Sequence, residues 1–191
     1  MDIKRYKDSI RTLAYIILLT AINYFIPFLS MAVMILWPVP IVYLVQKKEN
    51  NSVIGVIVIA ALINGLLFGT VMGLMTVIGF GLVGYVIGHI IKEGFSPLKT
   101  LITAVITVII SQSLVFYVSS GLMNLDYQTL LQQVLQNLSG ELDQQSVEQL
   151  IMTQMNLVRM IFPALLAVSA SITGILNYYV SAWYLRRRGL N

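Results

Sequence analysis

Four polar side chains that interrupt long apolar runs are the candidates for binding a solute: Asn23, Asn64, Gln112 and Arg159. An unpaired amide in hydrocarbon costs several kcal/mol, so each amide should face a partner helix or a cavity instead of lipid. The planar guanidinium of Arg159 suits a carboxylate or a phosphate. Arg159 could equally snorkel to the membrane interface, or pair with an acid of the polar stretch before it.

The residue patterns of common enzymes and metal sites are missing. Cysteine is absent, which removes thiolate metal ligands and a cysteine nucleophile. Neither His-Glu-x-x-His nor a Walker A pattern occurs. We interpret His89, the one histidine, as an interfacial or packed side chain. The apolar runs hold no acidic residue between their ends, which disfavours coupling through buried carboxylates. We therefore expect that the protein is not an enzyme and that it binds neither a cofactor nor a metal.

The composition is that of an integral membrane protein. Of the 191 residues, 58% are hydrophobic and 10% are charged, whereas soluble domains carry about 25% charged residues. The net charge of +4 comes from short basic clusters between apolar runs. That distribution indicates membrane topology, so we do not expect nucleic acid as a partner.

The apolar runs predict six transmembrane helices in a single membrane domain that covers residues 1–191. A span needs about 20 apolar residues. The expected spans are residues 13–28, 30–45, 53–68, 71–91, 98–118 and 160–185, all approximate. Pro38 and Pro40 fall inside the second span. They either occupy the first turn of a helix, where a missing N–H does no harm, or mark a discontinuous helix beside a solute site.

Glycines dominate the third and fourth spans. Spacing by four clears one face of a membrane helix for close approach by another helix. The residues with this spacing are Gly65, Gly69, Gly73, Gly84 and Gly88. We interpret them as helix-packing positions. Contact with a substrate is the alternative, and the first three could also mark a loosened turn.

Residues 119–158 form an acidic polar insert between the fifth and sixth spans. Leucines at helical spacing before Ser139-Gly140 predict one amphipathic helix. The capping-box pattern from Ser146 to Gln149 predicts a second. We expect an external helical hairpin, which serves either as a lid or binding element or as passive packing.

The basic residues predict that both termini are cytoplasmic. With six spans, 11 of the 12 Lys and Arg residues fall on one side, and only Arg159 falls on the other. Cytoplasmic segments are enriched in Lys and Arg. The expected architecture is therefore an all-α, N-in and C-in integral membrane protein.

Several motifs resemble a known group of transporter subunits. They are Ile26-Pro27-Phe28, Trp37-Pro38-Val39-Pro40-Ile41, Asn51-Ser52-Val53-Ile54-Gly55, and Gly84-Tyr85-Val86-Ile87-Gly88 followed by Lys92. The arrangement resembles the substrate-specific S components of energy-coupling-factor transporters. More closely, the chain resembles the YybS-like family of uncharacterised bacterial membrane proteins. S components have six helices with cytoplasmic termini and bind vitamins or metals from outside. The resemblance implies a coupling transmembrane subunit and ATPases as partners.

Two functions remain open from the sequence. The first is a solute-binding transporter subunit of the bacterial plasma membrane, with an outward pocket between helices one, three, five and six. The second is a structural or assembly protein of the cell envelope that uses its glycine faces and the external insert to bind other membrane proteins. The lipid bilayer is a partner in both.

Overall fold

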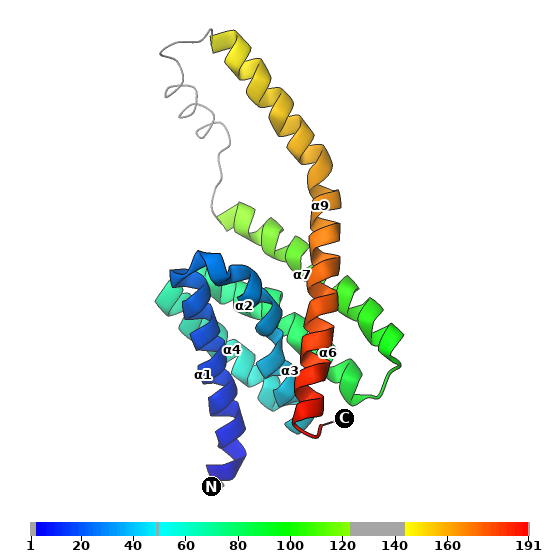
Figure 1. Ribbon diagram of the computed structural model, residues 1–191. Helices are drawn as coiled ribbons and strands as arrows, with labels where there is room; N and C mark the ends of the chain where they lie inside the picture. The colour runs from blue at the N-terminus through cyan, green and yellow to red at the C-terminus, as the bar shows by residue number, and fades with distance from the viewer. Residues whose placement is uncertain (1–2, 49, 123–143, 191) are drawn as a thin grey trace.

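The computed structural model describes residues 3–48, 50–122 and 144–190, and all secondary structure in these ranges is helical (Figure 1). The elements are α1 (Ile3–Phe25), the 3-10 turn η1 (Pro27–Leu29), α2 (Ser30–Leu36), α3 (Pro38–Lys47), α4 (Asn50–Phe68), α5 (Thr70–Leu74), the π-helix η2 (Met75–Gly81), α6 (Leu82–Lys92), α7 (Pro97–Leu122) and α9 (Gln144–Arg187). The first part of the predicted external hairpin, residues 123–143, lies outside the described residues.

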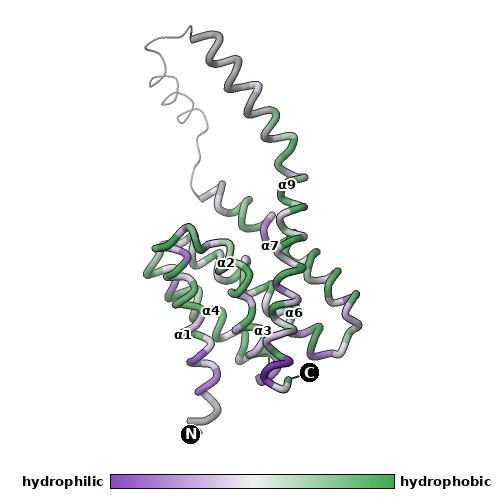
Figure 2. Tube along the Cα trace, viewed as in Figure 1, coloured by the Kyte–Doolittle hydropathy of each residue, from purple (hydrophilic) through white to green (hydrophobic). Residues whose placement is uncertain are grey.

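In the part of the chain that the structure describes, five helical segments are long and apolar enough to cross a membrane: Pro27–Lys47, Asn51–Phe68, Thr70–Lys92, Pro97–Ser119 and Met160–Arg187. They correspond to the second to sixth predicted spans. Large apolar side chains lie on the outside of the bundle, such as Phe28, which is 89% exposed, and Leu66, which is 87% exposed. Figure 2 shows apolar residues along the bundle and polar residues near the two chain ends. This is the surface of a multi-pass membrane protein.

The prolines of the second span sit at a break in the helix. α2 ends at Leu36, and Pro38 is the first residue of α3. Trp37 between them keeps helical dihedral angles, φ −61° and ψ −38°. Because Pro38 has no N–H, the carbonyl of Met34 one turn earlier lacks its usual helical donor. Asn177 of α9 fills this place: oriented to donate, its amide nitrogen lies 3.1 Å from Met34 O and 3.0 Å from Ile35 O.

The fourth span is not one regular helix. It consists of α5, the π-helical η2 and α6. The hydroxyl of Ser111 on α7 lies between two carbonyls of η2 and shares its one proton between them, at 2.7 Å from Ile78 O and 3.1 Å from Gly79 O. A π-segment within a membrane helix is tolerated where neighbouring helices serve its backbone groups.

α9 differs from the sequence prediction. The sequence predicts that the second helix of the insert is separate from the sixth span, whereas the structure has one helix of 44 residues that includes both and contains Pro163. At 1.5 Å per residue this helix is about 66 Å long, roughly twice the thickness of a bilayer core. Figure 1 shows it extending well past the rest of the bundle.

Three of the predicted packing glycines, Gly73, Gly84 and Gly88, lie at close contacts between helices. A Cβ added to Gly84 would lie 2.8 Å from Ile41 Cβ, and one added to Gly88 would lie 2.8 Å from Val45 Cβ. α6 therefore approaches α3 where these glycines face it. A Cβ added to Gly73 would lie 2.9 Å from the Ala61 carbonyl and 3.0 Å from the Cα of Gly65.

Gly69 differs from the other four glycines that the sequence predicts as helix-packing positions. Its φ of 96° is left-handed, and an added Cβ would meet nothing within 4 Å. It marks the turn between α4 and α5, where glycine is favoured because side chains strain a left-handed backbone.

Candidate functional site

Three buried polar side chains meet where α1, α4 and η2 pack together. The amide nitrogen of Asn64 donates to the hydroxyls of Thr20, at 2.8 Å, and Thr76, at 2.9 Å. All three residues are 0% exposed. We call this group the Asn64 cluster. Asn64 is one of the residues that the sequence analysis selects, whereas Thr20 and Thr76 are not, because each resembles any threonine in an apolar run.

The protons of the Asn64 cluster are all used. The Thr20 hydroxyl donates to Ile16 O at 2.9 Å, and the Thr76 hydroxyl donates to Met72 O at 2.8 Å. A hydroxyl has one proton to give, so neither threonine can also donate to Asn64. The amide oxygen Oδ1 of Asn64 is accordingly buried without a hydrogen-bond partner in the described part of the chain. If the amide were reversed, its nitrogen would take the place of Oδ1 and would be the buried atom without a hydrogen-bond partner among the described residues.

Two further buried polar atoms on neighbouring elements have no hydrogen-bond partner among the described residues. They are Asn23 Oδ1 on α1 and the indole Nε1 of Trp37. Trp37 is 0% exposed and stacks on Phe80 of η2 with ring centroids 3.5 Å apart. Phe80 lies one turn along η2 from Thr76. This part of the bundle thus combines an unused acceptor on α4, a second on α1 and an unused donor at the proline break.

The structure separates the four residues that the sequence analysis selects. Asn23 and Asn64 lie on α1 and α4, which pack against each other. Gln112 lies on α7 and is half-buried, while its neighbour Ser111 contacts η2. Arg159 lies in α9, which packs against α7, but its side chain lies outside the described residues. Of the three selected residues whose side chains the structure describes, Asn64 alone takes part in the buried cluster.

Basic residues gather at one end of the bundle, where both chain ends lie in Figure 1. The Lys92 ammonium donates to Val45 O at 2.9 Å and Lys48 O at 3.1 Å, so it caps the carboxyl end of α3. The Lys47 ammonium lies over the Tyr43 ring, and the Arg188 guanidinium lies over the Tyr184 ring. Tyr43 and Tyr184 contact each other edge to face. We call this the basic end.

His89 also lies toward the basic end. Its Nε2 atom is 2.9 Å from Glu93 Oε1, one turn along α6, and its ring stacks on Tyr85. It thus has an acidic neighbour four residues along the chain, and the contact is local to one helix.

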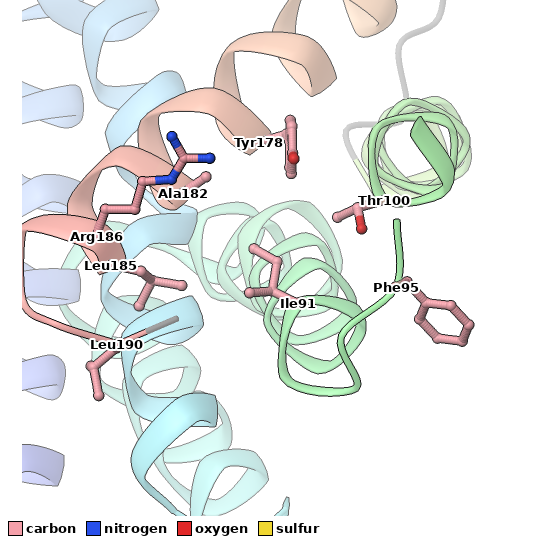
Figure 3. A pocket seen from close by; sticks show the side chains of 8 residues that line it. All are labelled: Ile91, Phe95, Thr100, Tyr178, Ala182, Leu185, Arg186 and Leu190. Carbon is pink, nitrogen blue, oxygen red and sulfur yellow. The ribbon is translucent and has the colours of Figure 1, made fainter. Parts of the chain in front are cut away.

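Two grooves open near the basic end and share Phe95, and we call them the Phe95 grooves. The first, about 140 Å³, lies between α6, α7 and α9 and is lined by Ile91, Phe95, Thr100, Tyr178, Ala182, Leu185, Arg186 and Leu190 (Figure 3). The second, about 240 Å³, is lined by Ile90, Phe95, Lys99, Ile102 and Thr103. These grooves are not at the place that the sequence predicts for a pocket, which is between helices one, three, five and six.

The helical bundle, its apolar surface and its candidate spans define a multi-pass membrane protein. The chain matches the family described as "Predicted membrane protein (DUF2232)" over residues 13–191, and it belongs to that family. No curated protein matches the chain, and no solved structure matches it. The family description is consistent with the membrane location and assigns no activity.

Proposed function

We propose that this protein is a solute-binding membrane subunit, similar to the S components of energy-coupling-factor transporters, and that the Asn64 cluster is its binding site. The observation that carries the proposal is the buried amide oxygen of Asn64, for which the described residues offer no donor. A buried acceptor left unpaired costs about 1–3 kcal/mol. A bound solute with an N–H or O–H group would remove that cost.

The surroundings of the Asn64 cluster favour an uncharged polar solute. Trp37 Nε1 offers a donor and Asn23 Oδ1 offers a second acceptor, both buried. Within Val53–Ile91, His89 is the one acidic or basic side chain, and it lies near the opposite end of α6. The solute would therefore carry at least one donor and one acceptor and no full charge, because an unpaired charge in this environment would be costly.

The site is closed in the structure. Trp37 and Phe80 are stacked, and the Asn64 cluster is fully buried. Entry would separate Trp37 from Phe80 of η2. π-Segments such as η2 frequently occur at functional sites. Under this proposal the Trp37–Phe80 stack opens to admit the solute.

The proposed membrane orientation places the basic end in the cytoplasm and the Asn64 cluster in the outer half of the membrane. It requires α1 to be a sixth span beside the five candidate spans. The clustering of Lys47, Lys92 and Arg188 at the basic end supports this orientation through the enrichment of Lys and Arg in cytoplasmic segments. A coupling transmembrane subunit and ATPases would then dock from the cytoplasmic side. The proposal includes no catalytic step.

Thermal unfolding of the detergent-purified protein tests the binding proposal. The probes are a panel of water-soluble vitamins and other uncharged polar solutes, each added at millimolar concentration. We expect at least one probe to raise the unfolding midpoint, and Asn64→Leu to abolish that increase. Thr103→Val is the matched control, because this hydroxyl of α7 donates within its own helix, to Lys99 O at 3.0 Å. A panel without effect, or an increase that survives in Asn64→Leu, would overturn the proposal.

One observation favours the alternative, an assembly protein that binds other membrane proteins. Residues 144–159 continue α9 beyond its candidate span, Met160–Arg187. This arm is about 24 Å long at 1.5 Å per residue. The glycine faces offer less support, because Gly73, Gly84 and Gly88 already contact other helices of the same chain. Co-purification of a membrane partner without an ATPase, lost on deletion of residues 144–159, would favour this alternative.

A further inference from the structure

We propose that each Phe95 groove binds an anionic phospholipid, with the phosphate held by Arg186 in the first groove and by Lys99 in the second, and with the acyl chains along the apolar walls. The proposal concerns the basic end and is independent of the solute site proposed at the Asn64 cluster. It rests on the shape and lining of the grooves and on which cations of the basic end are already engaged.

Each groove combines apolar walls with one cation. Ile91, Leu185 and Ala182 line the first groove together with Arg186. In Figure 3, Ile91, Leu185 and Tyr178 project into the space between the helices, and the guanidinium of Arg186 lies beside Ala182. The second groove has Ile90 and Ile102 with Lys99. Apolar walls below a cation match a molecule with a hydrocarbon part and an anionic head.

The neighbouring cations are already engaged within the protein. Arg187 lies over the Trp183 ring, with 4.6 Å from guanidinium carbon to ring centroid, and Arg188 lies over the Tyr184 ring at 5.5 Å. Lys92 donates to two carbonyls of the α3 end. Arg186 and Lys99, by contrast, line the grooves. Among the described residues that line the grooves, Arg186 and Lys99 are the cations that could contact a bound head group.

The charge balance selects an anionic occupant. Two acids of the described residues lie at the basic end. Glu93 faces His89 at 2.9 Å, and Asp8 lies close enough to Lys47 to act on its charge. Neither of them lines a groove. Basic pockets between membrane helices on the cytoplasmic side bind phospholipid head groups. A free phosphate would contact the cations but would leave the apolar walls of both grooves uncovered. The geometry therefore points to a lipid and not to a soluble anion.

The test is a lipid titration of the full chain in a neutral detergent, followed by the unfolding midpoint. The probes are phosphatidylglycerol, phosphatidylcholine and inorganic phosphate. We expect phosphatidylglycerol to raise the midpoint with saturation, and the other two to have little effect. A cation near the membrane surface contributes about 1 kcal/mol to binding an anionic lipid. Arg186→Gln and Lys99→Gln should each therefore raise the half-saturating concentration of phosphatidylglycerol about fivefold.

Arg187→Gln is the matched control, because it removes the same charge from the next residue without touching a groove. Ile102→Trp tests the apolar part: Ile102 is 50% exposed, so a larger ring there is tolerated by the fold but fills the second groove. It should weaken lipid binding without loss of basic charge. Equal stabilisation by phosphatidylcholine, stabilisation by phosphate alone, or an Arg187→Gln effect equal to that of Arg186→Gln would each overturn the proposal. Asn64→Leu should leave the lipid titration unchanged.

Discussion

Two buried asparagines occupy comparable places in the bundle and have opposite hydrogen-bond balances. Asn177, 2% exposed, faces the break between α2 and α3 and supplies donors to Met34 O and Ile35 O, one of which loses its usual helical donor to Pro38. Asn64, 0% exposed, gives both of its protons to hydroxyls and keeps an acceptor without a donor in the described residues. The Asn177 amide supplies a donor where the proline break removes one from the backbone. The Asn64 amide instead leaves a buried acceptor without a donor among the described residues, which is the property expected of a binding site.

The largest expected effect comes from Asn177→Leu. The substitution removes the Asn177 donors for Met34 O and Ile35 O, and Pro38 cannot replace the donor to Met34 O because it has no N–H. The carbonyl left without a donor should cost about 1–3 kcal/mol of unfolding free energy. Chemical denaturation in mixed micelles would measure the loss. Ser169→Ala is the control, since that exposed hydroxyl donates within α9, to Leu166 O. A loss below about 0.5 kcal/mol would show that Asn177 does not serve the break.

A smaller loss of stability is expected from Ser111→Ala. Ser111 donates to Ile78 O and Gly79 O of the π-helix η2, and one net hydrogen bond contributes about 1 kcal/mol. The loss should appear as faster amide hydrogen exchange within Met75–Gly81, because that segment depends on the contact. Ser113→Ala, two residues along α7 and exposed, is the control. Unchanged amide hydrogen exchange in η2 would show that the Ser111 hydrogen bond does not stabilise the π-helix.

A matched pair of glycine substitutions tests the close approach of α6 to α3. Gly84→Ala places a Cβ 2.8 Å from Ile41 Cβ and 2.9 Å from Pro38 O, and such overpacking costs about 1–3 kcal/mol. Gly55→Ala meets nothing within 4 Å and should stabilise α4 by up to about 1 kcal/mol, because alanine favours helix more than glycine does. Unfolding midpoints that move the same way in both variants would contradict the packing role of Gly84.

The sequence predicts the second to sixth spans, which the five candidate spans of the structure confirm, because hydrocarbon thickness sets their length. It also marks Asn64, since an amide inside an apolar run is conspicuous. It cannot predict Thr20 and Thr76, whose role depends on how α1 and η2 meet α4. The π-helix leaves no mark in composition, and the continuity of α9 past residue 158 depends on the absence of any strong stop signal before Pro163. Gln112 is conspicuous for the same reason as Asn64, yet it lies on α7 and does not belong to the Asn64 cluster.

The smallest expected change in stability distinguishes the two asparagines most clearly. Asn64→Leu removes the unpaired Oδ1 and strands no proton, because Thr20 and Thr76 still donate to Ile16 O and Met72 O. Replacing an unsatisfied buried group by an apolar one of similar shape is nearly neutral or stabilising, so the unfolding free energy should stay the same or rise by about 1 kcal/mol. The same substitution at Asn177 should lower it. Two losses of equal size would mean that both amides serve the fold, whereas opposite signs would mark Asn64 as a position where stability is given up for binding.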